Sequence, residues 1–202
     1  LKGRALDQEI AEDAYHTPYI RPLVQPKFRR EKKGLTPAER GTATHLVLQY
    51  LDLQNLDVPG QVEKLRLEAK LTAEQAAAVD GPALRRFLES PLAEEMRQAE
   101  TAAREYRFTV LMPARDYDPA AAEEDSILLQ GVVDCWFETP EGITVVDFKT
   151  DFVQTEEDVA QHAELYRGQL AAYSLALERV LEKAVTRKAL YFLQAGKTVE
   201  IS

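Results

Sequence analysis

Two acidic residues and a lysine are spaced so that they could act together on one face of a β-sheet. Asp134 ends the segment Gly-Val-Val-Asp, and Asp147 and Lys149 lie in the later segment Val-Val-Asp-Phe-Lys-Thr-Asp. Side chains alternate along a strand, so Asp147 and Lys149 project on one side while Val146 and Phe148 enter the core on the other. This spacing predicts a polar centre built on a buried strand.

The turn between the two segments brings the carboxylates together. Residues 139–142 read Thr-Pro-Glu-Gly, a hairpin turn, and a hairpin closed around residues 140 and 141 places Asp134 opposite Asp147. Like charges on opposed strands are destabilising, so this arrangement needs a cation. Lys149 supplies part of it and a divalent metal the rest, since Mg²⁺ is commonly held by one or two carboxylates and phosphate oxygens. Such a centre could hydrolyse a phosphate ester, with Lys149 orienting water or stabilising charge.

A simpler interpretation is a surface Asp–Lys–Asp ion-pair patch on a sheet edge. The upstream Gly-x-x-Asp on a paired strand favours the metal centre over it. His45 lies on an expected helix, where a lone histidine is more often packed or solvated than a ligand. Gln169 and Tyr173 are four residues apart on a later helix and share one face. A solvated Gln169 and a core Tyr173 are the alternatives to a role at the site.

The elements that must position these residues alternate between helix and strand. Thr36-Pro-Ala-Glu39 predicts a helix start, and that helix should run to about Leu53. Residues 60–103 are helical in pattern, with starts at Thr72 and Ser90 and a Gly-Pro break at 81–82, and form a helical insertion. The remaining predicted elements are strands 106–112, 127–138 and 143–149, an acidic loop 113–125, a helix 158–183, and strands 189–194 and 197–201. This order predicts an α/β domain with one mixed sheet flanked by helices.

Composition limits the classes of protein. The 202 residues carry 25 Lys and Arg against 34 Asp and Glu, a net charge of −9 that argues against a protein that coats nucleic acid. The single cysteine, Cys135, excludes an internal disulfide, a four-thiolate zinc site and an iron–sulfur cluster within the chain. No apolar run approaches a membrane helix, and no phosphate-binding loop of an ATPase is present.

Residues 1–34 differ from the rest. They hold eight Lys and Arg against five Asp and Glu, have no clear period, and are interrupted by prolines. We expect an extended arm or linker from a preceding domain, and a domain over 35–202. The chain begins with leucine, which suggests a piece of a longer polypeptide. The arm ends in a basic run that could bind DNA phosphates or be a solvated linker: Lys27, Arg29, Arg30, Lys32 and Lys33.

Four motifs occur in the order found in RecB-type nucleases of the PD-(D/E)XK superfamily, and within that group the chain resembles the C-terminal nuclease domains of AddA-type helicase–nucleases. The resemblance extends from about residue 34 to 195. The motifs are Gly41-Thr-Ala-Thr-His45, Gly131-Val-Val-Asp134, Asp147-Phe-Lys149-Thr-Asp151 and Tyr166-Arg-Gly-Gln169-Leu-Ala-Ala-Tyr173. No single motif is specific, but the ordered set is.

The resemblance implies a restriction-endonuclease-like fold and Mg²⁺-dependent hydrolysis of DNA, with Mn²⁺ as a substitute. His45, Asp134, Asp147 and the main-chain carbonyl of Phe148 would bind metal, and Lys149 would be the catalytic lysine. Further residues implied to support catalysis or contact DNA are Gln169 and Tyr173, with Glu105, at the start of the first strand, as a possible acidic member.

The resemblance also implies a setting. The substrate would be mainly single-stranded DNA produced by a helicase domain of the same polypeptide, in double-strand-break repair by recombination. An AddB-like protein would be the partner, ATP would act only through the helicase, and the protein would be bacterial, cytoplasmic and nucleoid-associated, with no membrane association. Two alternatives stay open: a catalytically silent scaffold or DNA-binding module, and a stand-alone exonuclease of the same superfamily.

Overall fold

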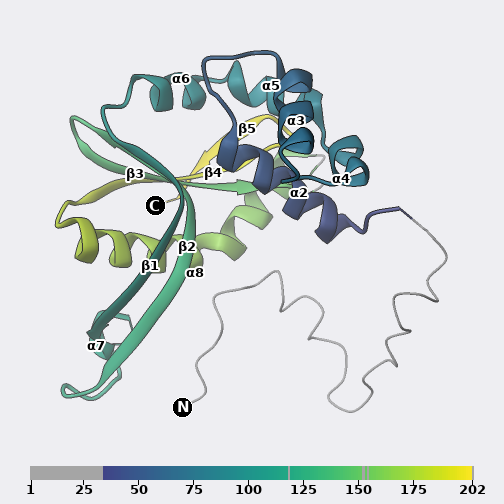
Figure 1. Cartoon of the computed structure of the whole chain (residues 1–202). Coiled ribbons are helices and arrows are strands. Elements are labelled where there is room, and N and C mark those ends of the chain that lie inside the picture. The colour runs from purple at the N-terminus through teal and green to yellow at the C-terminus, as the bar shows by residue number, and fades with distance from the viewer. Residues whose placement is uncertain (1–33, 118, 152, 154, 202) are drawn as a thin grey trace, which may run out of the picture. The chain divides into compact units, whose positions relative to one another are not determined.

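One mixed five-stranded sheet organises the chain. The computed structural model describes residues 34–117, 119–151, 153 and 155–201. Its strands follow the order β1-β2-β3-β4-β5, with β3 and β4 parallel and the other neighbours antiparallel (Figure 1). The strands are β1 (Ala102–Pro113), β2 (Ser126–Thr139), β3 (Gly142–Lys149), β4 (Val185–Phe192) and β5 (Lys197–Glu200). The predicted fold class, a mixed sheet flanked by helices, is confirmed.

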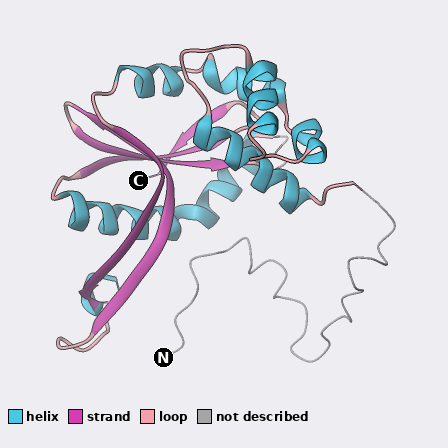
Figure 2. Ribbon diagram, viewed as in Figure 1, coloured by secondary structure: helices cyan, strands magenta, loops and turns pink. Residues whose placement is uncertain are grey.

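A long helix covers one face of the sheet. Parallel neighbours cannot be joined by a tight turn, so the chain crosses from β3 to β4 through α8 (Glu156–Leu181). This helix begins with a capping box at Thr155 and contacts β1, β2, β3 and β4 (Figure 2). It therefore carries Gln169 and Tyr173 beneath the strands that hold Asp134 and Lys149.

Within the described residues, five shorter helices precede the sheet. They are α2 (Pro37–Tyr50), α3 (Val58–Leu67), α4 (Ala73–Ala78), α5 (Gly81–Leu88) and α6 (Pro91–Gln98). Their hydrophobic core includes side chains from the face of the sheet opposite α8. The predicted caps Thr36, Thr72 and Ser90 each accept a hydrogen bond from the first turn of their helix. Phe87 of α5 packs edge to face on Phe148 and Tyr191 of the sheet. The central strand β3 is thus buried on both faces.

The β2–β3 hairpin has the predicted register. Thr139 pairs with Gly142 and Cys135 with Val146, so the turn is centred on residues 140 and 141. Extended by one pair, this register sets Asp134 opposite Asp147.

Several element boundaries differ from the predictions. Helix α2 ends at Tyr50 rather than Leu53, and a short helix, α7 (Ala114–Tyr117), lies in the predicted acidic loop. Strand β4 covers 185–192 rather than 189–194, because its polar first residues pair with β3 from Ile143 onward. The predicted arm 1–34, with its basic run at Lys27, Arg29, Arg30, Lys32 and Lys33, lies outside the described residues except for Gly34. In the part of the chain that the structure describes, no helix has the length and apolar character needed to cross a membrane.

Candidate metal centre

The two central strands separate at Asp134. Their ladder stops at Cys135 and Val146, and one residue further the Asp134 carboxylate accepts a hydrogen bond from the Phe148 N–H, at 2.8 Å. Beyond this point β1 and β2 curve together away from β3 (Figure 2). Asp134 is thereby held at the fork between the strands, where a buried main-chain donor fixes its orientation.

Asp147 and Lys149 form a buried ion pair on β3. Asp147 Oδ2 lies 2.8 Å from Lys149 Nζ, and the residues are only 3% and 6% exposed. The interpretation of these residues as a surface patch on a sheet edge is therefore wrong, because β3 is the middle strand of the sheet. Burial, and next the neighbouring charge of Asp134, raise the pKa of Asp147 to about 6, against the attraction of Lys149.

Helix α8 holds Lys149 from the other side. Lys149 Nζ donates to Gln169 Oε1 at 3.2 Å, and Gln169 Nε2 donates to the Tyr173 hydroxyl oxygen at 2.7 Å. The expectation that Gln169 and Tyr173 share one face is confirmed by this bond. A fixed amide oxygen orients the ammonium as well as stabilising its charge.

Tyr166 is a further neighbour of the lysine. Lys149 Nζ lies 3.5 Å from the centre of the Tyr166 ring, and the Tyr166 hydroxyl donates to Asp151 Oδ2 at 2.8 Å. The sequence places both residues in the motifs but indicates no role for them. Their geometry assigns one: the ring confines the ammonium by a cation–π contact, and Asp151 confines the ring.

Glu105 joins the centre through a strained backbone. By the β1–β2 register it lies opposite Asp134, and its φ is 52°, in the left-handed region that non-glycine residues seldom adopt. Before it, Arg104 donates to the Leu48 carbonyl of α2, whereas Phe108, after it, packs on Tyr173 of α8. In a regular strand Arg104 and Phe108, four positions apart, would face the same side of the sheet. Here they face opposite sides, so the backbone at Glu105 reverses the alternation of side chains.

Three of the candidate ligands converge where the strands fork. Atoms of His45, Glu105 and Asp134 all lie within 4.8 Å of one another, and His45 Nδ1 is 3.5 Å from Asp134 Oδ2. Burial, and next the charge of Asp134, raise the pKa of Glu105. Asp134 thus repels both Glu105 and Asp147, and the buried Lys149 ammonium pairs with Asp147. Hard oxygen donors with one imidazole and an excess of negative charge fit a divalent ion such as Mg²⁺ or Mn²⁺.

The structure places His45 and Asp134 together with Glu105, the possible acidic member, and places Asp147 beside Lys149, which Gln169 and Tyr173 support. The catalytic and metal-binding roles of these residues stay predictions. Phe148 reaches the centre through its N–H, which donates to Asp134. Its carbonyl as a ligand stays a prediction.

Gly131 has a packing role beside the centre that a matched pair of substitutions tests. A Cβ at Gly131 would lie 2.8 Å from the Phe108 ring and 3.4 Å from that of Tyr173, whereas one at Gly168 would meet nothing within 4 Å. We expect Gly131→Ala to lower the free energy of unfolding by about 1–3 kcal/mol through overpacking. Gly168→Ala should raise it by up to about 1 kcal/mol, because alanine favours helix. Urea denaturation measures both, and a neutral Gly131→Ala would contradict the packing.

Comparisons with known proteins give a family and a set of similar proteins for this chain. The family model described as the PD-(D/E)XK nuclease superfamily matches residues 14–200. The chain is similar to proteins that are each named as the A-type subunit of an ATP-dependent helicase/nuclease. The one from Acetivibrio thermocellus is 39% identical over 200 residues, which cover 96% of this chain and 16% of that protein. Those from Ruminiclostridium cellulolyticum and Bacillus cytotoxicus are 37% and 36% identical, covering 96% and 95% of this chain and 16% and 17% of theirs. The chain therefore spans about a sixth of the length of these curated relatives.

Proposed function

Because the chain belongs to the PD-(D/E)XK nuclease superfamily, we propose that it hydrolyses phosphodiester bonds of DNA with a divalent metal ion, Mg²⁺ by preference and Mn²⁺ as a substitute. One observation carries the proposal. A buried lysine, Lys149, is held by Asp147 and Gln169 on the strand beside a cluster of His45, Glu105 and Asp134. A cation-binding cluster beside an oriented ammonium is what a phosphate ester needs for attack by water.

The proposed roles follow from the contacts. His45, Glu105, Asp134 and Asp147, with the Phe148 carbonyl, would hold the ion. A bound divalent ion supplies Lewis acidity: it offsets charge on the phosphate oxygens and makes water a stronger nucleophile at neutral pH.

Lys149 is the proposed catalytic residue that donates to a phosphate oxygen or to the attacking water. Gln169 fixes the direction of that ammonium through its amide oxygen, and Tyr173 fixes Gln169. These two therefore act on the reaction through Lys149.

The substrate proposed is single-stranded DNA delivered by a helicase domain of a longer polypeptide, in double-strand-break repair by recombination at the bacterial nucleoid. The names of the relatives support the helicase part of this setting, because each relative is named as a subunit of an ATP-dependent helicase/nuclease and this chain matches about a sixth of it. ATP would act only at that helicase, and an AddB-like partner would complete the enzyme. A basic arm at Lys27–Lys33 would add phosphate contacts.

Matched DNA substrates test the substrate preference. A labelled single strand and its blunt duplex are incubated with the protein and Mg²⁺, and products are resolved on denaturing gels. We expect cleavage of the single strand and little of the duplex, since these 202 residues contain no phosphate-binding loop of an ATPase that could open the duplex. Equal cleavage of both would overturn the preference, and no cleavage of either by a folded protein would favour a silent scaffold.

Glu105 provides a test of the metal ligands. Glu105→Gln keeps the volume and removes one charge, so the Mg²⁺ concentration for half-maximal cleavage should rise by at least about tenfold. Glu63→Gln is the control, because Glu63 lies on the exposed side of α3, where it pairs with the neighbouring Arg66. A Mg²⁺ requirement unchanged by Glu105→Gln would exclude Glu105 from the ligand set.

A further inference from the structure

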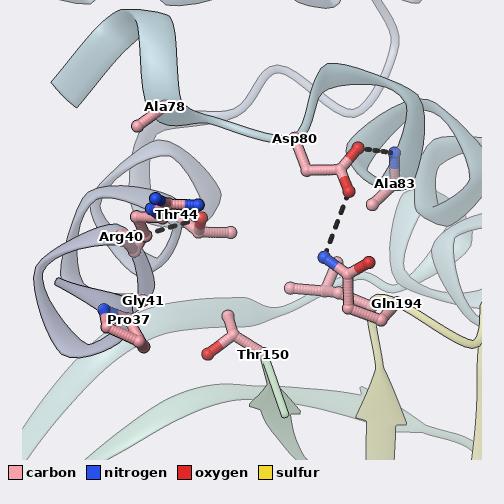
Figure 3. Close-up of a pocket in the computed structure, with 10 residues that line it drawn as sticks. Pro37, Arg40, Gly41, Thr44, Ala78, Asp80, Ala83, Thr150 and Gln194 are labelled. Carbon is pink, nitrogen blue, oxygen red and sulfur yellow. Dashed lines mark hydrogen bonds between the residues drawn. The ribbon is translucent and has the colours of Figure 1, made fainter. Parts of the chain in front are cut away.

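A pocket lies beyond the carboxyl ends of the two parallel strands β3 and β4. It has a volume of about 270 Å³ and is bordered by Thr150, just after β3, and Gln194, just after β4. The N-terminal half of α2 and the junction between α4 and α5 supply the other walls (Figure 3). Ligands of open α/β sheets bind at this kind of position.

Two segments that carry candidate site residues continue into the lining of the pocket. Gly41, one helical turn before His45, and Thr44, directly before His45, both line the pocket. Thr150, which also lines it, directly follows Lys149 in the chain. A Cβ at Gly41 would lie 3.1 Å from the Thr150 hydroxyl, so a side chain there would crowd the floor between α2 and β3. Lys149 faces α8 and Thr150 faces α2, so a strand of DNA that crosses the end of β3 with one phosphate at Lys149 can place a neighbouring nucleotide at this opening.

The polar groups of the pocket are fixed by their own contacts. Asp80 caps α5 through Oδ1, which accepts from the Ala83 N–H at 2.9 Å, and its Oδ2 accepts from Gln194 Nε2 at 3.1 Å (Figure 3). The Thr44 hydroxyl is anchored to the Arg40 carbonyl at 2.9 Å. These side chains come from segments far apart in sequence, so they form a preorganised polar rim.

The lining chemistry suits a base better than a phosphate. A carboxylate repels a phosphate but accepts from the exocyclic amino group of cytosine or adenine, and a glutamine amide can donate and accept beside it. Arg40, from the α2 wall of the pocket, supplies a cation for the backbone of the same nucleotide. The volume of about 270 Å³ is large enough to admit a single base, which is much smaller than a drug-sized ligand.

We propose that this pocket binds one base of the DNA strand, in the nucleotide beside the phosphodiester that is cut, with a preference for the amino-bearing bases cytosine and adenine. The inference rests on the proposed nuclease function and adds a substrate subsite to it. Thymine, which presents a carbonyl oxygen where cytosine presents the amino group, is disfavoured by Asp80.

Two aspartates that cap helices provide the test. Labelled oligo(dC) and oligo(dT) of equal length are titrated with the protein in EDTA, and binding is followed by fluorescence anisotropy. We expect oligo(dC) to bind about fivefold more tightly than oligo(dT), which is the lower end of the discrimination that one contact to a base provides. Asp80→Asn, which retains a side chain that can cap α5, should bring the ratio of the two affinities close to one. Asp57→Asn, the same change at the cap of α3, should leave it unchanged.

A space-filling change and a cleavage assay complete the experiment. Ala78→Leu fills the pocket without altering a charge and should also remove the preference, whereas Ala77→Leu, on the exposed side of α4, should not. With Mg²⁺, an abasic nucleotide moved along a single strand should impair cleavage at one position beside the cut. Equal affinities for both oligonucleotides, or a preference that survives Asp80→Asn and Ala78→Leu, would overturn the pocket. If no strand is cleaved but the preference for oligo(dC) is observed and depends on Asp80, the proposed nuclease function fails and the base pocket stands.

Discussion

Asp147→Asn is expected to abolish cleavage and, in the absence of metal, to stabilise the protein at pH 7. Cleavage should fall at least about a hundredfold, the scale on which charge-stabilising groups act in hydrolytic sites. The stability gain has a separate cause. Burial and Asp134 raise the pKa of Asp147 from 3.8 to about 6 in the folded protein, so its charged form is less favourable there than in the unfolded chain.

The sign of the pH dependence follows from proton binding. Between pH 4 and pH 6 the folded protein holds a proton on Asp147 that the unfolded chain has released, so the free energy of unfolding falls as pH rises. At pH 7 the whole penalty is present, and its removal is worth about 2–3 kcal/mol from a shift of about two pKa units.

Chemical denaturation in EDTA from pH 4 to pH 7 measures this difference. The free energy of unfolding of the Asp147→Asn variant should exceed that of the wild type most at pH 7, and the two values should converge near pH 4. Asp116→Asn, at an exposed position of α7, is the control that should follow the wild type. A variant that is destabilised equally at every pH would show that the carboxylate is not repelled in the folded protein.

Lys149→Met is expected to reduce kcat by about 10²–10³-fold while metal still binds. Methionine keeps an apolar stem beside Tyr166 and removes the ammonium that Gln169 and Asp147 orient. Because Asp147 then loses the ammonium that offsets its burial, its pKa should rise further and the metal-free protein should be less stable at pH 7 than the wild type. Mg²⁺ should restore part of that loss by supplying another cation.

Single-turnover cleavage and thermal unfolding with and without Mg²⁺ measure the two effects. Lys183→Met is the matched control, because Lys183 makes an exposed ion pair with Glu138 at the end of α8, worth at most about 1 kcal/mol. Cleavage at the wild-type rate by Lys149→Met would show that Lys149 is not a catalytic residue. Loss of Mg²⁺-dependent stabilisation in that variant would instead place Lys149 among the groups that hold the ion.

The sequence predicts the central pair of strands well, because their register depends on local features. A turn at residues 140 and 141 fixes which residues are opposed, so the position of Asp134 relative to Asp147 follows from counting. The helical spacing of Gln169 and Tyr173 likewise predicts their contact. These residues form the part of the centre that lies within one hairpin and one helix.

Glu105 and the pocket depend on tertiary structure. The connection between β1 and β2 is long, so no turn indicates that Glu105 opposes Asp134, and its left-handed backbone has no glycine to signal it. Asp80 and Gln194 are more than a hundred residues apart and meet only because α5 packs beyond the end of β4. Patterns along the sequence carry no signal for such contacts.

Metal-dependent cleavage of single-stranded DNA tests the central claim most directly. The wild-type protein is freed of metal with EDTA, and cleavage of a labelled single strand is followed before and after Mg²⁺ or Mn²⁺ is restored, beside Asp147→Asn. We expect no cleavage in EDTA, recovery with either ion, and none in the variant. Cleavage that persists in EDTA, or that Asp147→Asn retains, would contradict a metal-dependent centre at the fork of β2 and β3.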